Sequence, residues 1–289
     1  MNSFERIIAI GNTSALPLWR VILNDEIQNF GTTEEAVFKK LDKRYEIMRR
    51  ASHRAEYEPL TTAGGLISGV TAQAKRYADD GNTLCGDFIS KVIVKALSGS
   101  EANAAMGRIC ACPTAGSCGI VPAVLVTLEE EKLIPRRRVL EALLLASGFG
   151  AIVTENATVA GAEGGCQAEC GVAAAMAAAA AVYLMGGTDD MAVSAFSIAL
   201  MNVMGLVCDP VAGLVQIPCA QRNASQAVNA LVSADLALGG MTCPVTPDEM
   251  VETMYSVGQM LPRELRETAL GGMAATESAK KIEAEIFGK

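Results

Sequence analysis

The sequence predicts an all-α protein, and three observations lead to this fold class. Hydrophobic residues make up 51% of the 289-residue chain, but aromatic residues make up only 4%. Much of the apolar content is alanine, which is the best helix former and is poorly suited to strands. No segment shows the strict apolar and polar alternation of a half-buried strand. Because no linker or internal repeat divides the chain, we expect one helical domain over residues 1–289.

Caps, glycines and prolines set the expected helix boundaries. Residues 1–58 form a polar, amphipathic helical region, in which Thr32-Thr33-Glu34-Glu35 predicts the start of a helix that runs through Arg50. Pro59 ends this region. Further helices are expected up to Asp79, over 87–106 and 120–131, from Pro135 to about Gly150, over 171–185, from a Thr188 cap to about Val207, over 223–238, and from a Thr246-Pro247 start to about Met260.

Charge and hydropathy exclude two classes of partner. The formal net charge is −8, and the longest basic run is Arg136-Arg137-Arg138, so we expect no nucleic-acid binding. The longest apolar run, 172–185, has 14 residues. A membrane-spanning helix needs about 20 residues, so this run predicts a buried helix and no membrane partner. With no targeting segment visible at the N-terminus, we expect a cytoplasmic protein.

Nine cysteines in such a chain indicate metal ligands or reactive thiols more than disulfides. Cys166 closes a glycine-rich run, and Cys208 and Cys219 bracket a segment that contains glycine and two prolines. These positions lie on turns, where a thiolate can point at a metal. Three thiolates without a clear fourth suit a [4Fe–4S] cluster with one open iron, which indicates chemistry in place of electron transfer. Cys85 and Cys243 are expected to be small buried side chains.

Cys110, Cys112 and Cys118 form a second group, whose spacing matches no common zinc or ferredoxin pattern. The residues between them, 113–117, offer backbone N–H groups and hydroxyls just before a helix. Such a loop suits a carboxylate at a helix N-terminus. We therefore predict that this loop binds substrate, with the three cysteines lining it or packing beneath it.

Several long motifs resemble the α chain of the iron–sulfur-dependent bacterial L-serine dehydratases. The similarity extends over roughly residues 40–287, and the motifs occur in the order that the family has. They are Gly164-Gly165-Cys166-Gln167-Ala168-Glu169, Cys208-Asp209-Pro210-Val211-Ala212-Gly213-Leu214, Pro218-Cys219, the Cys110 to Ser117 loop, and Arg266-Glu267-Thr268 followed by Gly271 to Thr276.

This resemblance implies an all-helical catalytic domain with a [4Fe–4S] cluster on Cys166, Cys208 and Cys219. It implies a lyase of amino-acid catabolism that converts L-serine to pyruvate and ammonia and can feed gluconeogenesis. It also implies a separate regulatory β chain and an oligomer. The family's substrate loops correspond here to Thr62, Ala63, Gly64 and Gly65, and to Thr114, Ala115, Gly116 and Ser117.

The residues leave other hypotheses open. An open iron would bind the thiolate of cysteine well, so an iron–sulfur-dependent L-cysteine desulfidase is the alternative enzyme. An electron carrier or a non-catalytic helical scaffold would use the same cysteines differently. The catalytic base is not identified. His53, the one histidine, stands in a charged stretch, where we expect a surface or helix-end role in preference to catalysis. Glu163 and Glu169 flank Cys166 and are expected to support its loop.

Overall fold

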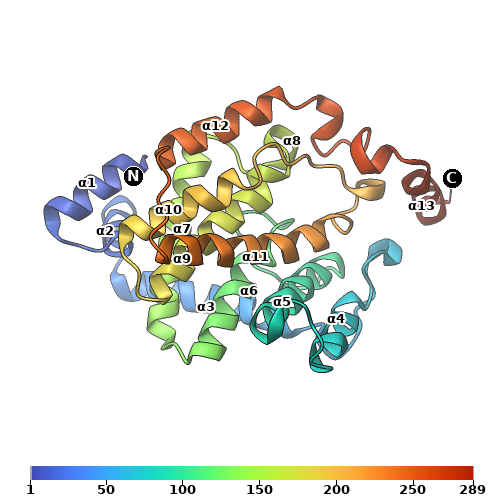
Figure 1. The fold of residues 1–289 in the computed structure, drawn as a ribbon, viewed down its shortest axis with the longest axis horizontal. Helices are drawn as coiled ribbons and strands as arrows, with labels where there is room; N and C mark the ends of the chain where they lie inside the picture. The colour runs from blue at the N-terminus through green and yellow to red at the C-terminus, as the bar shows by residue number, and fades with distance from the viewer. Residues whose placement is uncertain (1, 289) are drawn as a thin grey trace.

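A buried, alanine-rich helix, α9 (Val172–Leu184), lies at the centre of the protein. The computed structural model describes residues 2–288, and every α9 residue except Tyr183 is buried. A helix that is apolar on all sides must be surrounded by other elements. The surrounding helices are α6 (Ile120–Lys132), α7 (Arg136–Asn156), α10 (Asp189–Met201) and α11 (Cys219–Leu238) (Figure 1).

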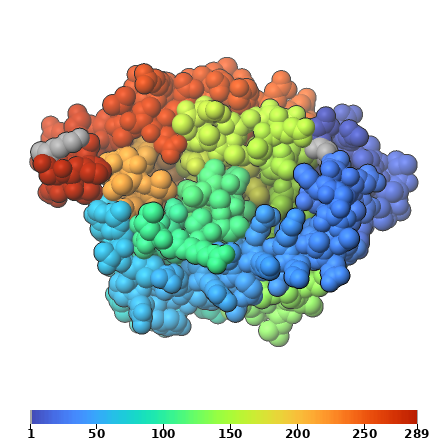
Figure 2. Space-filling view, turned by 180° about the vertical axis from the view of Figure 1, so that it is seen from behind, coloured from blue at the N-terminus to red at the C-terminus, as the bar shows by residue number. Residues whose placement is uncertain are grey.

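The remaining helices enclose this centre and carry the termini to opposite ends of the molecule (Figure 1). Seen from behind, the N-terminal segment in blue and the C-terminal segment in red occupy opposite edges (Figure 2). The remaining helices are α1 (Phe4–Ser14), α2 (Leu18–Phe30), α3 (Glu34–His53), α4 (Val70–Asp79), α5 (Gly86–Ala104), α12 (Pro247–Met260) and α13 (Glu277–Phe287). The short elements are η1 (Ala63–Gly65), α8 (Gly161–Gly164), the π-helical turn η2 (Gln167–Gly171), η3 (Val211–Gly213), η4 (Arg263–Leu265) and η5 (Gly272–Ala275).

The all-α prediction is confirmed. Within residues 2–288 there is no β-strand, and a single isolated bridge joins Cys208 to Arg266. The predicted caps are also confirmed: the side chains of Thr33, Thr188 and Thr246 accept hydrogen bonds from the first turns of α3, α10 and α12.

The predicted end of α7 near Gly150 is wrong, because the helix continues to Asn156. Its glycines serve close packing instead of helix termination. A Cβ on Gly148 would lie 2.5 Å from Cδ1 of Ile22, and a Cβ on Gly150 would lie 2.8 Å from Sδ of Met176. The burial gained by α2 and α9 against this face outweighs the helix-breaking tendency of glycine, which is only about 1 kcal/mol per residue.

Two other boundaries differ from the prediction. Helix α10 ends at Met201, not near Val207, because turns occupy the residues before Cys208, where Gly205 has φ +84°. Helix α11 begins at Cys219 itself, four residues before the expected start. The second difference matters for the site, since it places a predicted cluster ligand on the first turn of a helix.

Two segments, Arg136–Asn156 and Gln167–Leu184, are long and apolar enough to cross a membrane by length and composition. In the structure, 61% and 89% of their apolar windows are buried inside the protein. Buried core helices pass the same test, so these segments are weak indications of a membrane span.

Candidate active site

Cys166, Cys208 and Cys219 come from three separate segments and meet at one site. Cys166 lies between α8 and η2, just after Gly165, which has φ +74°. Cys208 is held in extended backbone: its N–H donates to Leu265 O at 2.8 Å, and its carbonyl accepts from Glu267 N at 2.7 Å. Cys219 opens α11. Cys166 and Cys208 are buried, and Cys219 is partly exposed.

Electrostatics show that the three thiols affect one another. Burial, together with nearby Cys166 and Glu169, raises the pKa of Cys208, and the same causes raise the pKa of Cys219 to about 12. In contrast, hydrogen bonding with the Cys170 thiol lowers the pKa of Cys166, and the positive charge of Arg222 acts in the same direction. Cys166 is therefore the thiol whose surroundings most favour the thiolate.

Two carboxylates join the thiols. One ligand atom from each of Glu169, Cys208 and Glu267 lies within 4.8 Å of the other two. Glu169 Oε2 is 3.9 Å from the Cys208 sulfur, and Glu169 Oε1 accepts a hydrogen bond from Thr114 Oγ1 at 2.7 Å. Burial raises the pKa of Glu169, while the Thr114 hydrogen bond lowers it.

The donor set and the space around it suit a thiolate-bound metal centre. Cysteine thiolates are the ligands that iron–sulfur clusters use. Gly161 leaves room beside two of the donors, since a Cβ there would lie 2.5 Å from Glu169 Oε2 and 3.1 Å from the Cys208 sulfur. The residues present therefore fit the predicted cluster.

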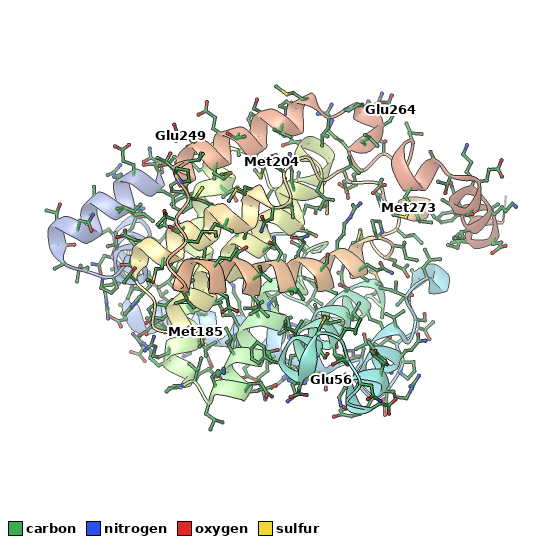
Figure 3. All side chains as sticks on the ribbon, viewed as in Figure 1. Glu56, Met185, Met204, Glu249, Glu264 and Met273 are labelled. Atoms are coloured by element: carbon green, nitrogen blue, oxygen red, sulfur yellow. The ribbon has the colours of Figure 1, made fainter. Side chains whose placement is uncertain are left out.

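A buried ion pair fixes the segment around Cys208. Arg222 on α11 donates to Asp209 Oδ1 at 2.8 Å and to the carbonyl of Val207 at 2.7 Å. The other oxygen of Asp209 accepts from Met273 N at 2.7 Å. Met273 lies beyond the C-terminal end of α12, on the connection toward α13 (Figure 3). The pair therefore ties three segments together on both sides of Cys208.

The loop from Thr114 to Ser117 lies against the cysteine site. The Thr114 hydroxyl reaches Glu169, and a Cβ on Gly116 would lie 3.2 Å from Glu169 Oε1. Ala115 is exposed. Ser117 is fully buried, and its hydroxyl donates to the carbonyl of Cys112 at 3.2 Å. Thr114 thus faces the site, whereas Ser117 shapes the turn.

The first amides of α6 already have hydrogen-bond partners within the protein. The amide of Gly119 donates to Asn223 Oδ1 at 2.9 Å, and the amide of Ile120 donates to the carbonyl of Ser117. Asn223 also donates to the carbonyl of Gly116 at 2.7 Å. Of the donors predicted for a substrate carboxylate, the amides of Ala115 and Gly116 are the ones on the accessible part of the loop.

Gln216 joins the second predicted substrate loop, around residues 62–65, to the segment between Cys208 and Cys219. The hydroxyl of Thr62 donates to Gln216 Oε1 at 2.8 Å, and the Gln216 amide donates to the carbonyl of Ala63. Gly64 and Gly65 are exposed and have φ values of +71° and +74°. Glycine adopts this left-handed backbone without the steric cost that other residues have.

Glu101 on α5 holds both ends of the same loop by hydrogen bonds. This carboxylate is fully buried on α5 and accepts hydrogen bonds from the amides of Leu60, Gly69 and Thr71 at 2.8, 2.9 and 3.0 Å. A buried charge is tolerated when hydrogen bonds replace its hydration. The two ends of the loop from Leu60 to Thr71 are therefore held by one side chain.

Four residues of the site were not singled out from the sequence: Glu101, Gln216, Arg222 and Glu267. Glu267 stood within a family motif, and Gln216 lay between two predicted ligands, so both had a sequence signal. Glu101 and Arg222 had none, because helical spacing does not show which distant loop a side chain meets.

The structure also tests the predictions for the other cysteines and for His53. Of the three cysteines predicted to line the loop or pack beneath it, Cys112 and Cys118 are buried and Cys110 is partly exposed. Cys85 was expected to be buried and is exposed, because it precedes α5 in an exposed turn beside Gly86. His53 ends α3, as expected, and pairs with Glu56 and Glu130.

Comparison with known proteins decides the family. The family model described as "Serine dehydratase alpha chain" matches residues 13–274. The chain belongs to the serine dehydratase alpha-chain family. It is 45% identical to the "L-serine dehydratase, alpha chain" of Peptoniphilus asaccharolyticus, covering 99% of this chain and 98% of that one. It is 41% identical to the "Probable L-serine dehydratase, alpha chain" of Bacillus subtilis strain 168, covering 98% and 94%.

A longer relative shows how this alpha chain compares with other members. The chain is 37% identical to the "L-serine dehydratase" of Haemophilus influenzae. The match covers 93% of this chain but only 60% of the Haemophilus protein. The relatives thus include proteins of about this length and a protein with additional sequence.

The burial of Ser117 gives a stability prediction. Ser117→Ala leaves the carbonyl of Cys112 without this partner, and we expect the free energy of unfolding to fall by about 1–3 kcal/mol. Urea unfolding measures this loss. The control is Ser225→Ala, which removes an exposed hydroxyl and should change stability by less than about 0.5 kcal/mol. Equal effects of the two substitutions would contradict the structural role of Ser117.

Proposed function

We propose that this chain is the catalytic subunit of an L-serine dehydratase, an L-serine ammonia-lyase that forms pyruvate and ammonia. Residues 1–289 would act as one catalytic domain. The observation that carries this proposal is the meeting of Cys166, Cys208 and Cys219 beside both predicted substrate loops, in a chain whose relatives are named for serine dehydration.

In the proposal, these three cysteines hold a [4Fe–4S] cluster. When bound, such a cluster supplies an open iron that acts as a Lewis acid toward the β-hydroxyl of serine. Three segments present the ligands, so the Asp209–Arg222 pair and the hydrogen bonds of Cys208 to residues 265 and 267 would preserve their spacing. Supporting groups of this kind orient metal ligands.

The chain's own residues would bind a zwitterion. The amides of Ala115 and Gly116 can donate to the substrate carboxylate, and the hydroxyl of Thr114 can do so in place of its hydrogen bond to Glu169. Glu169 and Glu267 can accept from its ammonium group, since opposite charges attract strongly where water is partly excluded. The amides of the exposed loop at Gly64 and Gly65 stand on the neighbouring segment, held by Gln216.

The overall reaction balances without an added reactant. Serine loses its α-proton and its β-hydroxyl as water, which gives aminoacrylate. The aminoacrylate becomes an imine, and one water hydrolyses it to pyruvate and ammonia. A positioned side chain that accepts the α-proton would give general base catalysis, which typically contributes 10²–10⁴-fold to the rate.

The L-cysteine desulfidase alternative gains no support from the comparisons, because the relatives are named for serine dehydration. We further propose a separate β chain as partner, since two of these relatives are named alpha chains. An oligomer and a cytoplasmic location complete the proposal.

The proposal is tested by anaerobic cluster reconstitution followed by a pyruvate assay. L-serine should give pyruvate and ammonia in equal amounts, with L-threonine a poorer substrate. The assay should be run with and without the β chain and repeated with L-cysteine. Sulfide release from L-cysteine with a higher kcat/KM than for L-serine would overturn the assignment.

The cluster ligands are tested by absorbance. Cys166→Ala, Cys208→Ala and Cys219→Ala should each abolish the brown absorbance of the reconstituted protein, because a cluster on three thiolates cannot lose one. Cys85→Ala and Cys243→Ala should retain it. Cys170→Ala is the closest control, because this thiol neighbours Cys166 yet is not a proposed ligand. An unchanged spectrum in any of the first three variants would disprove the ligand set.

Thr114 is tested by separating substrate binding from stability. Thr114→Val removes the hydroxyl that faces the site, and we expect KM for L-serine to rise about ten- to a hundred-fold. This corresponds to about 1.5–3 kcal/mol for a hydrogen bond to a charged group. Thr114→Ser keeps the hydroxyl and should restore KM. A lower melting temperature with unchanged KM would remove Thr114 from substrate binding.

A further inference from the structure

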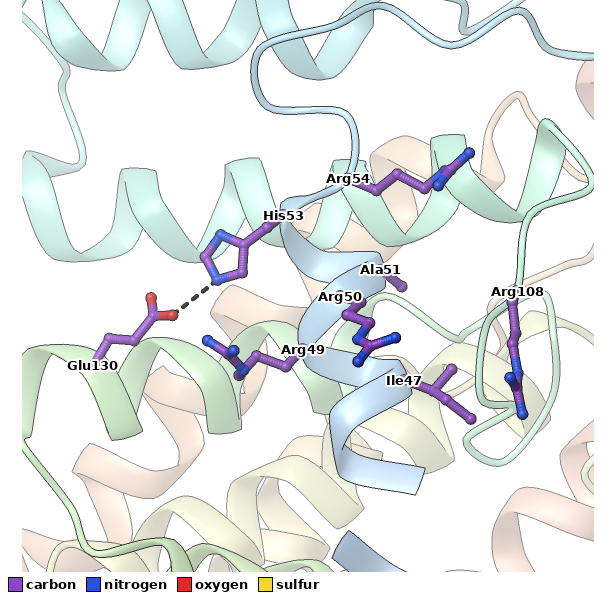
Figure 4. A pocket seen from close by; sticks show the side chains of 8 residues that line it. All are labelled: Ile47, Arg49, Arg50, Ala51, His53, Arg54, Arg108 and Glu130. Atoms are coloured by element: carbon purple, nitrogen blue, oxygen red, sulfur yellow. Dashed lines mark hydrogen bonds and ion pairs between the residues drawn. The ribbon is translucent and has the colours of Figure 1, made fainter. Parts of the chain in front are cut away.

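A basic pocket lies at the C-terminal end of α3, apart from the cysteine site. The cavity has a volume of about 750 Å³ and is lined by Arg49 and Arg50 of α3, by Arg54 directly after this helix, and by Arg108 of the connection between α5 and α6. Arg50 and Arg54 project from α3 toward the loop that carries Arg108 (Figure 4). Four arginines around one cavity depart sharply from a chain with a net charge of −8. We call this cavity the arginine pocket.

Three of the four arginines of the arginine pocket are not paired with an acidic side chain in the part of the chain that the structure describes. Among residues 2–288, Arg50, Arg54 and Arg108 form no ion pair or side-chain hydrogen bond. Arg49 has one ion pair, in which its Nε is 3.7 Å from Glu46 Oε1, and this Nε is shielded from solvent without a hydrogen-bond partner. Side chains of like charge repel one another, so the pocket is favourable for an anion.

The acidic residue that lines the pocket is already paired. Glu130 accepts from His53 Nε2 at 2.8 Å (Figure 4). It also forms an ion pair with Lys95 Nζ at 3.1 Å. It therefore contributes little negative charge to the four arginines. Their combined charge remains available to a ligand.

The chemistry of these side chains identifies the ligand class. The planar guanidinium group presents donors in a fork that matches two phosphate oxygens at once. Arg54 is the C-cap of α3 and keeps helical backbone angles four residues after Arg50, so the two backbones are separated by about 6 Å along the helix axis. Arg108 approaches from the facing loop. A single phosphate cannot use all of these forks, whereas a chain of two or three phosphates can.

We propose that the arginine pocket binds a small anion that carries a di- or triphosphate group. Its volume falls within the range of roughly 300–1,000 Å³ that is typical of small-molecule sites. Arg50, Arg54 and Arg108 line a cavity and do not lie along a flat surface, which favours a small ligand over an acidic protein partner, whereas Arg49 extends toward the Glu130 side of α3 (Figure 4). No residue of this pocket belongs to the cysteine site, so the proposal does not rest on the proposed dehydratase reaction.

Isothermal titration calorimetry on the full chain at low ionic strength tests the proposal. The probes are sodium tripolyphosphate, pyrophosphate and orthophosphate, and we expect saturable binding that weakens in that order. The double substitution Arg50→Ala and Arg108→Ala should weaken tripolyphosphate binding at least about tenfold, equivalent to about 1.4 kcal/mol. Replacing the same two residues by lysine should give an intermediate affinity, because the charge stays but the fork is lost.

The control is Arg76→Ala, which removes an exposed arginine from α4 and should leave the affinity unchanged. Melting temperatures of all variants check that folding is retained. Three results would overturn the proposal: no saturable binding of tripolyphosphate, equal weakening by Arg76→Ala, or equal affinity for orthophosphate. Tighter, arginine-dependent binding of a short poly-glutamate peptide would also overturn it, since the pocket would then serve an acidic protein partner.

Discussion

The buried helix α9 is the constraint on which the rest of the structure depends. Alanine on nearly every face gives it no polar side to turn to solvent, so four helices must cover it. Its small side chains also let those helices approach closely. The π-helical turn at residues 167–171 continues directly into α9 and carries Glu169, with Cys166 just before it. The position of the candidate site is therefore fixed by the packing of the core.

Buried polar contacts hold the loops around the site that the packing of the core does not fix. Glu101 holds the loop from Leu60 to Thr71, Gln216 joins this loop to the cysteine segment, and Arg222 pairs with Asp209 beside Cys208. Each of these groups would be costly to bury without its partners, by about 1–3 kcal/mol or more for a charge. Breaking one contact would therefore move a loop that contributes to the site, so the geometry depends on residues outside the predicted substrate loops.

Much of the fold could be predicted because its signals are local. Thr33 and Thr246 mark helix starts through their own side chains, and the alanine composition indicates the helical class. The end of α7 could not be predicted from sequence, because Gly148 and Gly150 are packing contacts to Ile22 and Met176. Contacts between site residues that are far apart in the sequence could not be predicted for the same reason. The contact of Thr114 with Glu169 joins residues 55 positions apart, and spacing along the chain does not reveal it.

The connection between α5 and α6 links the two regions to which we assign ligands. Arg108 lies near its start, where the amide of Gly107 is bonded to the carbonyl of Ala102, and Thr114 lies six residues further on. An anion held between Arg108 and α3 would restrain the first part of this connection, while Ser117 restrains the last. A ligand can shift an equilibrium only by binding its states with different affinities. Regulation through the arginine pocket would therefore require Arg108 to move with the Thr114 loop. A change in KM for L-serine on addition of tripolyphosphate would indicate that the two sites are coupled.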